Sequence, residues 1–160
     1  MAAETGWKPD AAQAIIEAGK SAPGALLPIL HALQDAFGYI DRSAVPVIAE
    51  ALNLSRAEVH GVITFYHDFR AAPPGERVLK LCRAESCQAM GCETLVAHLA
   101  ARHGIAVDAT TTDGRLTVET VYCLGNCALS PAAMLDGELL GRVDAALLDD
   151  LCRPQPGSVS

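Results

Sequence analysis

All six cysteines of the 160-residue chain lie in its second half, and the first 81 residues contain none. A site built from cysteine therefore belongs to the second half alone. Four of the cysteines form two pairs, Cys82 with Cys87 and Cys123 with Cys127. In a reducing compartment, clustered cysteines are more often metal ligands or redox groups than a disulfide framework.

The start of the chain and its charge restrict the compartment and the partners. Residues 1–10 are polar and show no secretory signal, and no apolar run reaches the ~18 residues of a membrane helix. We therefore expect a cytoplasmic protein without direct membrane insertion. Phosphate binding needs an excess of Lys and Arg, so the formal net charge of −7 argues against nucleic acid as a partner.

The cysteine-free half shows helical periodicity. Apolar residues recur at helical spacing over 26–37, and Gly38 follows where a left-handed residue ends a helix. Further helices are expected over 11–18 and from residue 41 or 43 to residue 52. Ser55 and Glu58 form a capping box that opens another helix.

The face of that last helix is expected to contain Val59, Val62, Ile63 and Tyr66. Phe65, Tyr66 and Phe69 are interpreted as core aromatics, some of which serve as anchors of an interface in the alternative interpretation. His60 and His67 are interpreted as polar surface or capping groups.

A break at residues 71–77, which contain two prolines and a glycine, divides the chain. We expect a helical region over 1–73, a second domain over 74–153 and a flexible tail over 154–160.

The second domain alternates strands with helices. Strands are expected over 78–82 and 116–121, a helical face from Cys92 to about residue 103, a hairpin over 133–140 and a closing helix over 144–151. A right-handed crossover makes the first two strands parallel. The fold class is α+β: a helical bundle followed by a thioredoxin-like domain with a small mixed sheet.

Each cysteine pair follows a predicted strand. Because neighbouring parallel strands end at the same sheet edge, four thiolates can converge there. The intervals of four and three residues differ from the two-residue knuckles of most structural zinc sites. They favour a single 2Fe-2S cluster on Cys82, Cys87, Cys123 and Cys127, and zinc is the main alternative.

An oxidised cluster with four thiolates has a charge of about −2, so the surrounding segments must supply hydrogen-bond donors. Gly125 lets the backbone approach the sulfurs, Arg83 adds a positive charge and Glu85 is expected to face solvent. Further backbone donors are expected at small or polar residues: Ala84, Ser86 and Asn126.

Cys92 and Cys152 are interpreted as bystanders, Cys92 as a buried free thiol on a helix. Neither cysteine segment contains a histidine, which argues against a Rieske-type site. The C-x-x-C motif of thiol-disulfide chemistry and the known NAD-binding motifs are absent from the sequence. We therefore expect no catalysis by the isolated chain. Three classes stay open: electron-transfer subunit, zinc-stabilised interaction module and thiol redox protein.

The two cysteine spacings, the segment 122–127 and the segment 61–66 resemble the thioredoxin-like 2Fe-2S subunit family, over roughly residues 10 to 152. Members accompany the flavoprotein of NADH dehydrogenase (complex I), NAD-linked hydrogenases and NAD-dependent formate dehydrogenases. The segments 26–30 and 134–138 look most like the formate dehydrogenase gamma subunit.

The resemblance implies that the cluster exchanges electrons with FMN in a partner flavoprotein subunit, which also binds NAD. It implies in addition that the helical region docks that partner. Whether the cluster lies on the main electron path or stores one electron beside the flavin is left open by the sequence.

Overall fold

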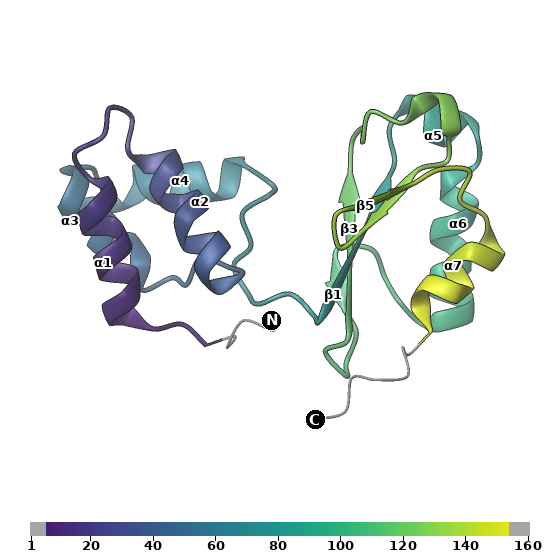
Figure 1. The fold of residues 1–160 in the computed structure, drawn as a ribbon, viewed down its shortest axis with the longest axis horizontal. Coiled ribbons are helices and arrows are strands. Elements are labelled where there is room, and N and C mark those ends of the chain that lie inside the picture. The colour runs from purple at the N-terminus through teal and green to yellow at the C-terminus, as the bar shows by residue number, and fades with distance from the viewer. Residues whose placement is uncertain (1–5, 154–160) are drawn as a thin grey trace. The chain divides into compact units, whose positions relative to one another are not determined.

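The computed structural model describes residues 6–153, and the chain divides into two compact units, Met1–Pro74 and Gly75–Ser160 (Figure 1). The expected tail at 154–160 lies outside the described residues. None of the helices between residues 6 and 153 has both the length and the apolar character needed to cross a membrane.

The first unit is built from helices, as predicted. Within residues 6–74 these are α1 (Pro9–Gly19), α2 (Leu26–Phe37), α3 (Ala44–Leu52) and α4 (Arg56–Phe65). Gly38 ends α2 with a φ of 80°, a left-handed conformation that glycine adopts at little cost. The apolar faces of the helices meet in one core, whose largest fully buried side chains are Ile16, Ile29, Leu30, Leu33, Ile48 and Val59.

The capping box at the start of α4 is confirmed. The Glu58 N–H donates to Ser55 Oγ at 3.1 Å, and the Ser55 N–H donates to Glu58 Oε2 at 2.8 Å. These two bonds satisfy backbone donors that the first helical turn leaves unpaired.

The interpretation of Phe65 and Tyr66 as core residues is wrong. Phe65 is 72% exposed and Tyr66 is 43% exposed, whereas Phe69 is buried against the ring of His31. Helical periodicity places Tyr66 beside Val62 only if the helix continues, but Tyr66 has extended backbone angles and α4 ends before it.

The second unit contains a five-stranded mixed sheet with the order β2-β3-β1-β4-β5. β1 (Arg77–Cys82) and β3 (Leu116–Val121) are parallel, as the crossover rule predicts. β4 (Ala133–Leu135) and β5 (Glu138–Leu140) form the predicted hairpin. The short β2 (Ala109–Thr110), which the sequence did not reveal, pairs with β3.

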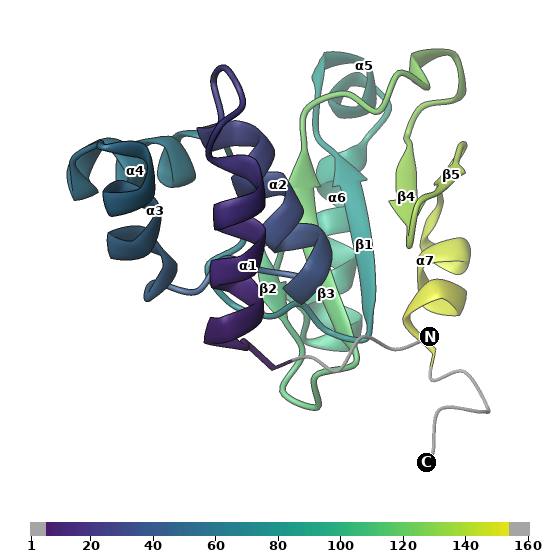
Figure 2. The ribbon, with the colours of Figure 1, turned by 60° about the vertical axis from the view of Figure 1, so that its left-hand side comes forward.

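Two helical segments cover one face of this sheet (Figures 1 and 2). The first is α6 (Cys92–His98), continued by a π-helical turn η1 (Leu99–His103), and the second is α7 (Ala145–Cys152). Their apolar side chains form a core with the strands, centred on the buried residues Leu79, Leu81, Leu95, Leu99, Val118 and Leu148.

Two short helical elements, which the sequence did not reveal, lie within the cysteine segments. α5 (Glu85–Ala89) contains Cys87, and a 3₁₀ turn, η2 (Cys127–Leu129), begins at Cys127. Segments of five and three residues are too short for an apolar period to be recognised.

Candidate metal centre

Both predicted cysteine pairs follow parallel strands that end at the same edge of the sheet. Cys82 is the last residue of β1 and stands opposite Val121, the last residue of β3. Cys123 follows two residues later. Figure 2 shows α5 and the chain after β3 at the same end of the sheet. The structure thus brings the two cysteine segments together, as the sequence predicts.

One pair is buried and the other is exposed. Cys82 and Cys87 each have 2% of their surface exposed, whereas Cys123 and Cys127 are exposed to solvent. The Sγ atoms of Cys123 and Cys127 lie 3.8 Å apart. Two thiolates on one tetrahedral metal ion, with metal–sulfur bonds of about 2.3 Å, are separated by about 3.8 Å. The exposed pair therefore has the spacing of two ligands to one metal ion.

Backbone donors surround the sulfurs. The Gly125 N–H donates to Cys123 Sγ at 3.4 Å. Burial raises the pKa of the Cys82 thiol, but hydrogen bonds from the Ala84 N–H, the Cys87 thiol and the N–H groups of Cys123 and Leu124 hold that pKa below its ordinary value. Such donors stabilise negative sulfur, as an iron–sulfur cluster requires. Donation from the second cysteine segment to Cys82 also shows that the segments are in contact.

The backbone at Cys123 is strained. Its φ is 88°, in the left-handed region that side chains other than glycine rarely adopt. Conformations of this kind cost about 1–3 kcal/mol and are concentrated at functional sites. Here the conformation accompanies the short loop in which the Gly125 N–H donates to the Cys123 sulfur.

A pair of serines connects the two cysteine segments. Ser86 Oγ and Ser130 Oγ are hydrogen-bonded at 2.7 Å, and Ser130 Oγ also donates to the Cys127 carbonyl at 2.7 Å. The Cys87 thiol lies 3.7 Å from Ser130 Oγ. Ser130 is buried, so this hydroxyl is fixed between Cys87 and Cys127.

Arg83 does not offer the cysteine segments the unpaired positive charge that its position in the sequence suggests. Arg83 Nε lies 2.8 Å from Glu93 Oε1, and Arg83 Nη2 lies 2.8 Å from Glu93 Oε2. This two-pronged ion pair neutralises the guanidinium locally. Glu85 is exposed, as expected.

Cys92 is fully buried, in agreement with its predicted position on a helical face, and it packs in one cluster with Cys82 and Cys87. Burial and the neighbouring Glu93 carboxylate raise the pKa of its thiol, which favours the neutral form. Cys152 is half-buried at the end of α7 and packs against the core of the second unit, far along the chain from both pairs. Their assignment as bystanders stays a prediction.

The donor set fits a 2Fe-2S cluster better than one zinc ion. Four thiolates around one zinc ion would all lie about 3.8 Å from one another. Among residues 6–153, no three cysteine sulfurs lie within 4.8 Å of one another. The thiols are thus spread more widely than a single tetrahedral shell, as a centre with two irons requires.

Comparison with known proteins gives the same chemistry. A model of the thioredoxin-like 2Fe-2S ferredoxin family matches residues 12–154. The chain belongs to this family. The cofactor for which the family is named is the 2Fe-2S cluster, so the comparison and the geometry of the four thiols agree. The family resemblance inferred from the sequence is confirmed, as is the thioredoxin-like fold.

Similar proteins carry the names of subunits of larger enzymes. The chain is 35% identical over 119 residues to an NADH-quinone oxidoreductase subunit of Pseudomonas aeruginosa, covering 74% of this chain and 72% of that protein. It is 30% identical over 128 residues to the HndA subunit of the NADP-reducing hydrogenase of Solidesulfovibrio fructosivorans, covering 80% and 75%.

A solved structure shows the same fold. The crystal structure of an air-oxidized NAD+-reducing NiFe hydrogenase matches with a TM-score of 0.65 and 32% identity. The match covers 81% of this chain but only 22% of the hydrogenase chain.

Sequence reasoning predicted four cysteine ligands but missed Ser130. The serine follows Cys127 by three residues and has no distinguishing pattern of its own. Its contacts with Cys87 and Ser86 arise from tertiary structure, because β4 pairs with β1 and the Cys82 N–H donates to the Ala132 carbonyl at 3.0 Å. No local signal could therefore have revealed them.

Proposed function

We propose that Cys82, Cys87, Cys123 and Cys127 hold one 2Fe-2S cluster and that the protein is an electron-transfer subunit. A bound cluster of this type supplies one-electron redox chemistry. The observation that carries the proposal is the 3.8 Å separation of Cys123 Sγ and Cys127 Sγ beside a Cys82 sulfur that accepts N–H groups from their segment.

The chain's own residues have three tasks in this function. The backbone donors at Ala84, Leu124 and Gly125 stabilise negative sulfur and so favour the reduced state. The exposed pair, Cys123 and Cys127, leaves one side of the centre open to solvent, where a partner can approach. The buried pair anchors the centre in the fold.

The partner in this proposal is a flavoprotein subunit that binds FMN and NAD(H) and exchanges electrons with the cluster. The chain's relatives are named as subunits of NADH-quinone oxidoreductase and of an NADP-reducing hydrogenase, which supports this choice. The helical region, 1–73, is proposed to dock that partner through exposed aromatics such as Phe65. The free thiols of the chain suit a reducing cytoplasm.

The specific complex proposed is a soluble NAD-dependent formate dehydrogenase, in which this chain is the gamma subunit. The support is the resemblance of segments 26–30 and 134–138. The equivalent subunit of respiratory NADH dehydrogenase or of an NAD-linked hydrogenase is the second candidate, and the names of the relatives favour it.

The test is to isolate the tagged full chain anaerobically from its own cells and to assay the material that accompanies it. We expect a co-purifying FMN protein and an EPR signal of the reduced cluster that NADH produces. Formate-dependent NAD+ reduction by the same material supports the formate dehydrogenase assignment. NADH oxidation that depends on quinone, or NAD+ reduction that depends on hydrogen, supports the second candidate instead. A chain that binds no flavoprotein and shows no NADH-dependent signal contradicts the subunit proposal.

A further inference from the structure

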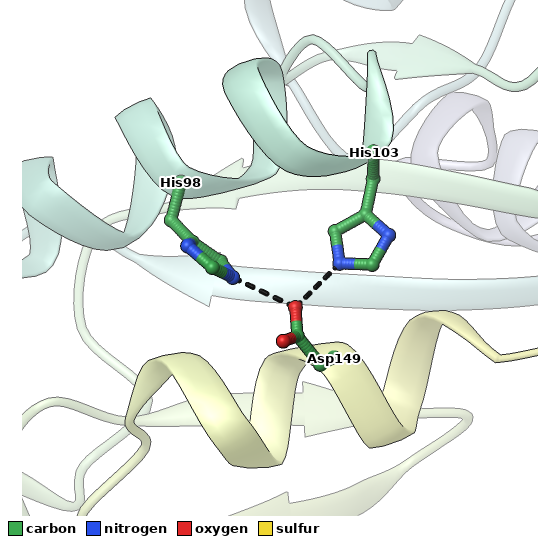
Figure 3. A group of neighbouring side chains, drawn as sticks. All are labelled: His98, His103 and Asp149. Atoms are coloured by element: carbon green, nitrogen blue, oxygen red, sulfur yellow. Dashed lines mark hydrogen bonds and ion pairs between the residues drawn. The ribbon is translucent and has the colours of Figure 1, made fainter.

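Two histidines and one aspartate meet on the helical face of the second unit. His98 Nε2 lies 2.7 Å from Asp149 Oδ1, and His103 Nε2 lies 2.6 Å from the same oxygen. Figure 3 shows both rings pointing from one helical segment toward Asp149 on α7. Within residues 6–153, this is the one group of three His, Cys, Asp or Glu side chains whose ligand atoms all lie within 4.8 Å of one another.

The π-helical turn explains why the two rings point the same way. His98 ends α6 and His103 ends η1, five residues later. In a regular α-helix, residues five apart are rotated by about 140° around the axis and face different sides. A π turn, with its wider i to i+5 repeat, brings them toward one side. Such turns are rare in proteins overall but are often found at functional sites.

The group is partly open to water. The side chains of His98, His103 and Asp149 are 26%, 21% and 31% exposed, respectively. An ion could therefore enter from solvent and keep a water molecule as a further ligand. Both imidazole Nε2 atoms converge on one carboxylate oxygen, so the three ligand atoms already lie close together.

We propose that His98, His103 and Asp149 bind one divalent transition-metal ion of the zinc type. Two imidazole nitrogens and a carboxylate oxygen are ligands that zinc accepts readily. With metal–ligand bonds of about 2.0–2.1 Å, tetrahedral ligand atoms lie about 3.3 Å apart. The observed nitrogen–oxygen distances of 2.6 and 2.7 Å open to this value by small side-chain rotations.

The site is separate from the cysteine centre and has a different task. Cys92, which packs beside Cys82 and Cys87, begins α6, and His103 lies eleven residues further on. At ~1.5 Å per residue, the two ends of this helical segment are about 16 Å apart. A metal ion at His98, His103 and Asp149 joins α6 and η1 to α7, and so fastens the last helix to the fold.

The test uses the full chain, loaded with its iron–sulfur cluster under anaerobic conditions, and Zn²⁺ alone as the probe. Bound zinc is measured against a chromophoric chelator, and iron is measured in the same samples. Asp149→Asn keeps an oxygen that accepts hydrogen bonds but loses the charge, and His103→Gln removes a nitrogen ligand. The control is His60→Gln, a change of an exposed histidine on α4.

We expect the unaltered protein to bind one zinc ion per chain without losing iron. Both site variants should bind it at least about tenfold more weakly, since even indirect changes around a metal ligand cost that much. The control should bind zinc as the unaltered protein does. Zinc uptake only in exchange for iron, or equal affinity in Asp149→Asn and the unaltered protein, overturns the proposal.

A second measurement does not depend on any variant. X-ray absorption at the zinc edge of the unaltered protein should show nitrogen and oxygen ligands at about 2.0–2.1 Å. Sulfur ligands at about 2.3 Å would assign the zinc to cysteines and would overturn the proposal.

Discussion

Cys82 stands opposite Val121 across the parallel strands β1 and β3. This pairing determines where the cysteines meet, because the chain after Val121 reaches Cys123 two residues beyond the sheet edge at which β1 ends. A slip of one residue in the register would turn every side chain of a strand to the other face. The proposed metal centre therefore depends on the sheet register as much as on the cysteine spacing.

Serine substitutions at the proposed ligands should remove or distort the cluster. Cys123→Ser replaces a thiolate that lies 3.8 Å from Cys127 Sγ, and the hydroxyl is a poor ligand for iron. We expect a large loss of iron and acid-labile sulfide per chain, measured after anaerobic purification. The matched controls Cys92→Ser and Cys152→Ser should retain both. Loss of the cluster in Cys92→Ser would show that the ligand assignment is wrong.

Ser130→Ala should weaken retention of the cluster without abolishing it. The change removes a hydroxyl that bonds Ser86 Oγ and the Cys127 carbonyl and lies 3.7 Å from Cys87 Sγ. It leaves the direct 3.2 Å bond from Ser86 Oγ to that carbonyl in place. Losing a group that orients metal ligands typically lowers metal affinity about 10–100-fold. We expect iron to transfer to an added chelator correspondingly faster than in Ser21→Ala, a change of an exposed serine in the first unit. Equal rates would mean that the serine does not support the centre.

Phe65→Ala should leave the stability of the first unit almost unchanged. The side chain is 72% exposed, so its removal opens no cavity, and the free energy of unfolding should change by no more than about 0.5 kcal/mol. Leu33→Ala, at a fully buried position, should cost about 2–5 kcal/mol in the same denaturant titration. A large decrease in the free energy of unfolding of Phe65→Ala would show that this ring is part of the core.

The same variant bears on partner binding. Exposed aromatic side chains are enriched among residues that dominate interfaces. If the helical region docks the flavoprotein, Phe65→Ala should reduce the amount of FMN that co-purifies with the tagged chain while its own iron content stays constant. Unchanged recovery of FMN would exclude Phe65 as an anchor.

Ser55→Ala should destabilise α4 through loss of its cap. The Ser55 hydroxyl accepts the Glu58 N–H at 3.1 Å, and replacement of such a cap costs about 1 kcal/mol. Gln13→Ala, at an exposed position of α1, is the control and should stay within about 0.5 kcal/mol. Circular dichroism during urea unfolding measures both, and equal midpoints would show that the cap contributes nothing.

Features with a local signal could be predicted from the sequence. The left-handed Gly38, the Ser55–Glu58 capping box and the hairpin over 133–140 each depend on residues a few positions apart, and each is present in the structure. The parallel pairing of β1 with β3 followed from the handedness of crossovers. Convergence of the two cysteine segments then followed from that pairing.

Features that arise from tertiary packing could not be predicted. The end of α4 exposes Tyr66, although its spacing from Val62 and Val59 is that of a buried helical face. Arg83 pairs with Glu93, which lies ten residues further along the chain. The number of charged residues in the sequence does not reveal which of them form such a pair. The meeting of His98 and His103 depends on a π turn that has no recognised sequence pattern.

Metal analysis of the anaerobically purified full chain decides whether four cysteines hold one 2Fe-2S cluster. With two ligands on each iron, we expect about two irons and two acid-labile sulfides per chain. We also expect a red-brown colour and a rhombic EPR signal that appears only on reduction. One zinc ion at the cysteines with no sulfide would show that the chain does not hold this cluster.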